Sequence, residues 1–69
     1  MTKKQAEIIM AYAKGDMRIK DAGNLVHMHP TTISYHLGMI KEETGRDPKN
    51  FFDLCYLVSI AAGLTGGNT

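Results

Sequence analysis

A cluster of uncharged hydrogen-bonding side chains near the middle of the sequence carries the groups best suited to binding chemistry. On a helix with about 100° between successive residues, Thr31, Tyr35 and Gly38 fall on one side, and Ser34 lies at its edge. Thr and Ser hydroxyl groups can contact base edges or phosphates, and a Tyr hydroxyl group can contact a phosphate. The pattern is typical of a helix that enters the major groove of DNA.

Gly38 allows two interpretations. A glycine inside a helix costs roughly 1 kcal/mol relative to Ala, so its presence on a solvated surface can reflect neutral drift. Alternatively, the bare backbone lets the helix approach a nucleic acid closely. The sequence leaves both interpretations open.

The charge of the chain is nearly balanced, with a formal net charge of +1. No acidic residue occurs from Asn24 to Lys41, however, so this stretch carries no negative charge. We expect Lys20, His36 and Lys41 to hold the backbone of a bound DNA duplex. Because a strongly basic footprint is missing, nucleic-acid affinity is expected to be modest or to depend on a dimer.

Three histidines, His27, His29 and His36, suggest a metal site, but no cysteine lies close and no carboxylate completes a ligand set. We therefore predict no metal and no cofactor. His29 is better interpreted as the N-cap of a helix that starts at Pro30, with its ring able to reach a phosphate.

Catalysis is not expected. No nucleophile occurs with an adjacent base and an orienting acid, and 69 residues can hardly build a large cleft. The single cysteine, Cys55, falls in an apolar segment and is predicted to be a small buried hydrophobe. We predict that the chain is not an enzyme, and no small-molecule effector is evident.

These side chains need a scaffold, and the residues from 19 to 37 fit a helix-turn-helix. Gly23 supplies the small residue where two helices touch, and His27 takes the turn position, where a positive φ is often needed. Met28 is expected to fill the corner between the helices. Ile33 and Leu37 then point back to the core, which leaves the hydroxyl-bearing side outside.

Helical spacing of apolar residues extends over most of the chain, and no segment alternates like a strand. The predicted helices run from Lys3 to Lys14, from about Arg18 to Val26, from Pro30 to Thr44, and from after Pro48 to about Ala62. The expected fold is all-α, a small helix-turn-helix domain with a three-helix core, related to homeodomains and winged helices, plus a C-terminal helix. Residues 1–62 would form this domain and residues 63–69 a flexible tail.

Two segments resemble a known family. The stretch from His29 to Leu37, HPTTISYHL, is similar to the H-x-x-T-hydrophobic-x-Y-R-L segment of the PucR/CdaR-type helix-turn-helix. The stretch from Ile40 to Pro48, IKEETGRDP, is similar to the I-x-x-x-T-G-x-D-P stretch of that family. The resemblance covers about residues 10–61. The family is the DNA-binding domain of regulators of purine and sugar-diacid metabolism.

The resemblance implies that His29, Thr32 and Tyr35 belong to a DNA-reading segment. The family Arg is replaced here by His36, which weakens the charge that would meet phosphate. In the larger regulators this domain ends a long sensory chain. Here we expect a free-standing small protein, such as a phage-type or mobile-element regulator, to which effector sensing does not carry over.

The last predicted helix has apolar residues on two sides. One stripe is expected to be buried in the core, namely Phe51, Leu54, Cys55, Val58 and Ala61. Phe52, Tyr56 and Ile60 form a second stripe, and Ile8 and Tyr12 give the first helix a similar excess. Two apolar sides favour a homodimer interface, although a compact fold could cover both. A twofold dimer would place two recognition helices in successive major grooves, about 34 Å apart.

The leading hypothesis is a sequence-specific double-stranded DNA-binding protein, a small transcriptional regulator that reads the major groove with the helix from about Pro30 to Thr44. The alternative is a protein-interaction adaptor with the same fold and no DNA binding. No apolar run reaches the roughly 20 residues of a membrane span, and no signal peptide is recognisable. We therefore expect a cytoplasmic protein with no membrane partner.

Overall fold

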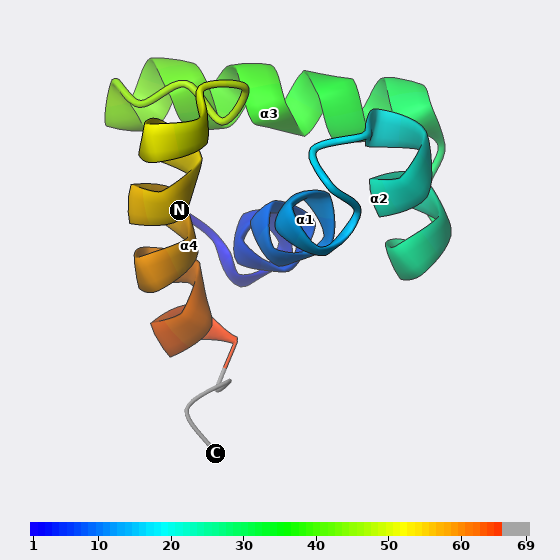
Figure 1. The fold of residues 1–69 in the computed structure, drawn as a ribbon, viewed down its shortest axis with the longest axis horizontal. Helices are drawn as coiled ribbons and strands as arrows, with labels where there is room; N and C mark the ends of the chain where they lie inside the picture. Colours follow the sequence, from blue (N-terminus) through cyan, green and yellow to red (C-terminus); the bar gives the residue numbers. More distant parts are fainter. Residues whose placement is uncertain (66–69) are drawn as a thin grey trace.

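The computed structural model describes residues 1–65 and contains four α-helices, with no strand among those residues (Figure 1). The helices are α1 (Lys3–Lys14), α2 (Ile19–Val26), α3 (Pro30–Thr44) and α4 (Phe51–Leu64). The predicted all-α class is confirmed. Helix α4 extends two residues beyond its expected end, so Gly63 and Leu64 are helical rather than part of a tail. The remainder of the predicted tail, residues 66–69, lies outside the described residues.

Helix α1 is the central element of the fold. It contacts each of the other three helices, whereas α4 contacts only α1. Figure 1 shows α1 nearly end-on in the centre, with α3 running across above it and α2 and α4 on its right and left sides. A capping box starts α1: the Thr2 N–H donates to Gln5 Oε1 at 3.0 Å, and the Gln5 N–H donates to Thr2 Oγ1 at 3.1 Å.

This central position corrects one sequence prediction. Ile8 is 0% exposed and Tyr12 is 3% exposed. Both residues lie in the core of the single chain, so the expectation that they contribute to a dimer interface is wrong. The excess apolar surface of α1 is needed because three helices surround it.

Helix α4 packs with a narrower stripe than predicted. Leu54, Leu57 and Ala61 are buried, and Leu57 was not expected in this role. Phe51 and Cys55, predicted to be buried, are exposed. The physical reason is that α4 packs against one helix only, which covers one line of side chains and leaves those at its edge open.

The corner between α2 and α3 has the predicted helix-turn-helix geometry. His27 adopts the left-handed conformation, with φ of 58°, and the Met28 N–H donates to the Gly23 carbonyl oxygen at 2.9 Å. A Cβ atom at Gly23 would lie only 2.5 Å from the Met28 carbonyl oxygen. Only glycine fits there without movement of the backbone, so Gly23 and His27 together set how α3 leaves the corner.

Candidate nucleic-acid interface

The hydroxyl-bearing side of α3 faces outward. Ile33, Leu37 and Ile40 are buried against the core, and this anchoring fixes the rotation of the helix about its axis. The residues predicted for the opposite side are all exposed, namely Thr31, Ser34, Tyr35 and Gly38. Lys41, which was predicted to hold the DNA backbone, is exposed as well. Tyr35 is a large aromatic residue, yet 64% of its surface is exposed. We call the four uncharged residues Thr31, Ser34, Tyr35 and Gly38 the α3 face.

The start of α3 is held by His29, as predicted. Its Nδ1 atom accepts a hydrogen bond from the Thr31 N–H at 3.1 Å, and Pro30 occupies the first turn. His29 is exposed, whereas Thr32 is half-buried. His29 therefore lies beside Thr31 at the N-terminal end of the α3 face.

His36 lies off the α3 face. It is half-buried, and its Nδ1 atom is inaccessible to solvent and has no hydrogen-bond partner among residues 1–65. Its ring packs edge-on against Tyr35, with 5.6 Å between the ring centroids and 73° between the planes. This is the T-shaped arrangement that aromatic rings favour.

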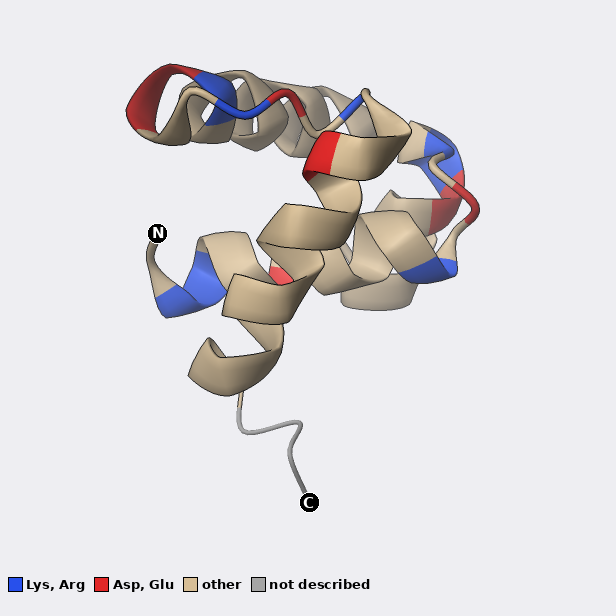
Figure 2. Cartoon of the chain, turned by 60° about the vertical axis from the view of Figure 1, so that its left-hand side comes forward, with Lys and Arg blue, Asp and Glu red and all other residues tan. Residues whose placement is uncertain are grey.

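Charge is distributed unevenly along α3. Its first eleven residues, 30–40, carry no Lys, Arg, Asp or Glu, and Figure 2 shows charged segments only toward the C-terminal end of the helix and in the turn that follows. Lys41 Nζ lies 3.7 Å from Asp47 Oδ2, an ion pair that the sequence did not predict. Lys20 is exposed on α2, the first helix of the helix-turn-helix.

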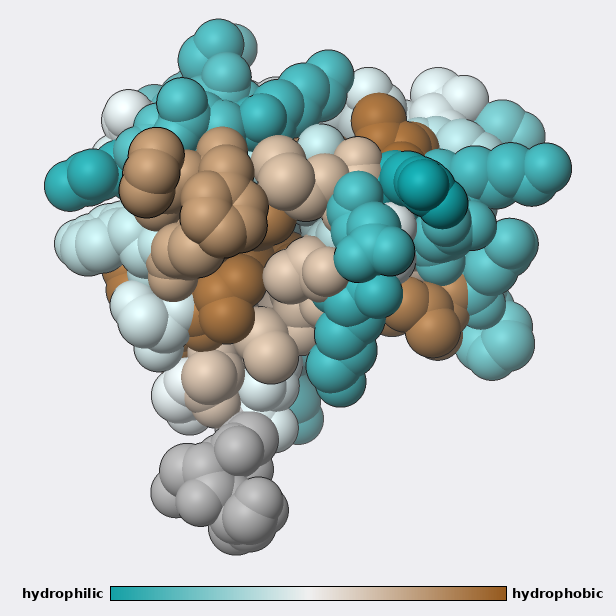
Figure 3. All heavy atoms as spheres, in the orientation of Figure 1, coloured by the Kyte–Doolittle hydropathy of each residue, from teal (hydrophilic) through white to brown (hydrophobic). Residues whose placement is uncertain are grey.

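A separate apolar surface lies on α4. Phe52, Tyr56 and Ile60 are exposed, as expected for its second stripe, and Phe52 is 79% exposed. The Arg46 guanidinium carbon lies 4.3 Å above the centroid of the Tyr56 ring and covers part of it. The surface in Figure 3 is hydrophobic over α4 and over its junction with α1.

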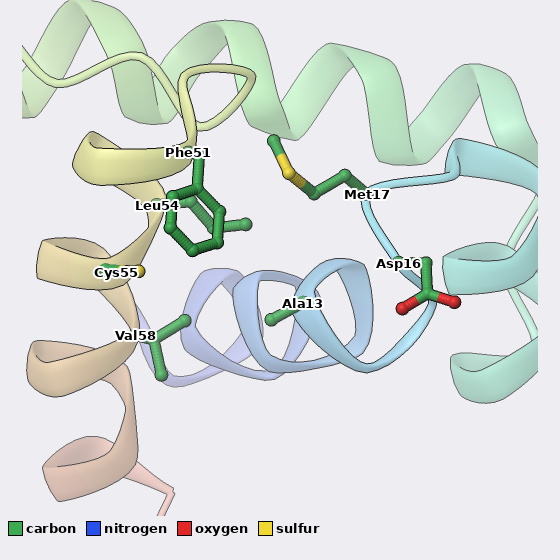
Figure 4. Close-up of a pocket in the computed structure, with 7 residues that line it drawn as sticks. All are labelled: Ala13, Asp16, Met17, Phe51, Leu54, Cys55 and Val58. Atoms are coloured by element: carbon green, nitrogen blue, oxygen red, sulfur yellow. The ribbon is translucent and has the colours of Figure 1, made fainter.

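An apolar groove of about 460 Å³ adjoins this surface, between α4, α1 and the turn that follows α1. Figure 4 shows Phe51, Cys55 and Val58 along its α4 side, opposite Ala13 and Met17. Among residues 1–65, no three His, Cys, Asp or Glu side chains meet in a way that could hold a metal ion. None of the four helices there has the length and apolar character needed to cross a bilayer.

Comparison with known proteins assigns the chain to a family. Residues 5–61 match the model of the PucR C-terminal helix-turn-helix domain. No curated protein and no solved structure gave a significant match. The matched region contains the whole helix-turn-helix corner, the α3 face and most of α4. The chain therefore belongs to the PucR C-terminal helix-turn-helix family, and this membership implies DNA as its partner.

Proposed function

We propose that the protein is a sequence-specific double-stranded DNA-binding protein that acts as a small transcriptional regulator. Its recognition element is α3, with the N-terminal two thirds of the helix in the major groove. The observation that carries the proposal is the α3 face, an exposed and uncharged helix side that is rich in hydrogen-bonding groups.

The contacts follow from the positions of the side chains. Thr31, Ser34 and Tyr35 reach base edges or adjacent phosphates, and His29 and Thr32 contribute at the start of the helix. Lys20, Lys41 and the accessible edge of His36 serve the phosphate backbone. Glu42 and Glu43 are exposed near the C-terminal end of α3, where their charge repels phosphates. This repulsion favours close approach by the N-terminal part of the helix.

A homodimer is part of the proposal. Phe52, Tyr56 and Ile60 present apolar area that the single chain leaves open, and burial of such area favours association. A twofold arrangement through α4 would supply two copies of α3 and would double the weak charge. We place the protein in the cytoplasm, where it would have access to DNA.

A second candidate is supported by the same apolar surface. The net charge of +1 and the exposed aromatic residues of α4 also suit an adaptor that binds another protein and no DNA. The two functions differ in salt dependence. DNA affinity should fall steeply between about 50 and 200 mM salt, because bound phosphates release counterions. An apolar protein interface should not.

Selection from random duplexes with the purified protein tests the proposal. A DNA-reading regulator enriches one motif, and a twofold dimer enriches a palindromic one. The Ser34→Ala, Tyr35→Ala double variant should lose the enrichment. Both side chains are exposed, so the fold should survive, which circular dichroism checks. An unenriched pool from the wild-type protein would favour the adaptor.

A further inference from the structure

A groove runs beside the α3 face, and the turn between α3 and α4 forms its second wall. Its volume is about 310 Å³. It is lined by Ser34, Leu37, Gly38, Lys41, Asp47 and Lys49. Two of these residues, Ser34 and Gly38, belong to the α3 face that the sequence predicted, and Lys41 was predicted to hold the DNA backbone. Asp47 and Lys49 had no assigned role and extend this site to a second element.

We propose that this groove takes one backbone phosphate of the bound DNA and that Lys49 pairs with it. The inference rests on the proposed function, since it needs α3 to lie against a duplex. It assigns the α3–α4 turn to the DNA contact and predicts that Asp47 opposes binding.

Lys49 is positioned for this role by a well-anchored turn. Pro48, which precedes it, is fully buried. The Lys49 backbone N–H donates to Asp47 Oδ1 at 3.0 Å, and the Asp47 N–H donates to Asp53 Oδ2 at 3.1 Å. The base of the side chain is therefore held in place, while its ammonium group is exposed and takes part in no ion pair within residues 1–65.

The other side of the groove suits the same anion. The Ser34 hydroxyl group can donate to a phosphate oxygen, and Gly38 leaves open space: a Cβ atom there would meet nothing within 4 Å. Lys41 supplies a second positive charge, which is paired with the Asp47 carboxylate at 3.7 Å. A phosphate entering the groove competes with this carboxylate for Lys41 and experiences its repulsion.

The salt dependence of DNA binding measures the contact directly. The magnitude of the slope of log K against log salt for a B-DNA complex falls by about 0.9 for each phosphate contact that is removed. The probe is a fluorescently labelled pool of random-sequence duplexes, titrated at several salt concentrations with wild-type protein and the single variants. Lys49→Ala should lower the magnitude of the slope by about 0.9, and Lys49→Arg should keep it.

Two further variants make the test specific. Lys14→Ala is the matched control, because Lys14 is an exposed lysine that lines a different groove with Leu25 and Thr65. Its slope should equal that of the wild type. Asp47→Asn keeps an oxygen for the Lys49 N–H but removes the competing charge, and it should tighten DNA binding.

The outcomes separate this inference from the proposed function. A wild-type protein with salt-dependent binding and a Lys49→Ala variant with an unchanged slope would overturn the phosphate site alone. An equal loss in Lys14→Ala would also overturn it, since the effect would then come from net charge. If the wild-type protein binds no duplex at any salt concentration, the proposed function fails and the phosphate site fails with it.

Discussion

At the scale of single residues, Gly23 in α2 and Gly38 in α3 have opposite surroundings. A Cβ atom at Gly23 would press on the Met28 carbonyl oxygen at 2.5 Å, whereas one at Gly38 would enter open space. The first glycine is required by packing. The second is not required by the fold, so its presence reflects either close approach of α3 to DNA or neutral drift.

Substitution of Gly23 by Ala should destabilise the fold by about 1–3 kcal/mol, because backbone must shift to relieve the contact. Thermal unfolding monitored by circular dichroism measures the loss. Gly38→Ala is the matched control, which should gain up to about 1 kcal/mol of stability from better helix propensity. Equal stability of the two variants would contradict the close approach at Gly23.

Gly38→Ala also distinguishes the two interpretations of this glycine. If α3 lies close to DNA at Gly38, the added methyl group weakens DNA binding although it stabilises the protein. Fluorescence anisotropy with the selected duplex measures the affinity. A variant that is more stable and binds equally well would show that Gly38 reflects neutral drift.

Tyr12 gives the stability of the fold a dependence on alkaline pH. Burial raises the pKa of its hydroxyl group, and the negative charge of Asp47 raises it further. In the unfolded chain Tyr titrates near pH 10. Above that pH the unfolded chain loses this proton before the folded chain does, so stability is full below about pH 10 and falls as pH rises.

The measurement is denaturant unfolding between about pH 9 and pH 11, around the unfolded Tyr pKa. Wild-type protein should lose stability more steeply than Tyr12→Phe, which lacks the titrating group. If the free energy of unfolding falls equally with pH in both proteins, the titration of Tyr12 does not affect stability.

At the scale of the elements, the His29 side chain secures the end of α3 that carries the candidate contacts. Its Nδ1 atom satisfies the Thr31 N–H, so His29→Ala should cost about 1 kcal/mol of stability. His29→Asn keeps a capping oxygen and should recover most of it. Urea unfolding of both variants checks the prediction, and equal losses would contradict the capping role.

The sequence predicted α3 and the corner well because their signals are local. Glycine at position 23, a residue that tolerates positive φ at His27, and proline at position 30 each act within one turn of the chain. The Thr-Gly pair of the family motif also acts locally, because it ends α3. Gly45 adopts the left-handed conformation, with φ of 74°, and the Arg46 N–H donates to Thr44 Oγ1 at 3.1 Å.

Other features depend on which elements pack together in space, and the periodicity of the sequence does not predict this. Helical spacing showed that Ile8 and Tyr12 are apolar residues in excess of one stripe of α1. It could not show that three helices surround α1 and bury both residues. The conformation of the turn after α1 was not predicted either. Asp16 and Met17 both have positive φ, of 56° and 61°, although the neighbouring Gly15 could adopt a positive φ at lower cost. The ion pair between Lys41 and Asp47 depends on the path of the turn between α3 and α4. The sequence predicted where this turn lies but not the path that it follows.

At the scale of the whole molecule, the three residues Phe52, Tyr56 and Ile60 of α4 form an apolar surface that is exposed within residues 1–65. Phe52 is 79% exposed, so Phe52→Asp should leave monomer stability nearly unchanged. It should weaken a dimer that buries this face, because a carboxylate would lose its hydration there. Sedimentation velocity across a concentration series measures the association.

The matched control is Asn24→Asp, which adds the same charge at an exposed position of α2 and should leave association unchanged. A wild-type protein that sediments as a monomer at every concentration would contradict the dimer. The same result for Phe52→Asp and wild type would contradict this choice of face.

Sequence discrimination by α3 is the central claim, and one ratio tests it most directly: the affinity for the selected duplex divided by the affinity for a scrambled duplex of the same composition. Specific DNA-binding proteins reach ratios of roughly 10³ or more at physiological salt. The wild-type protein should show such a ratio, and the Ser34→Ala, Tyr35→Ala double variant should approach unity. A ratio that is high and unchanged in the double variant would mean that another surface reads the DNA.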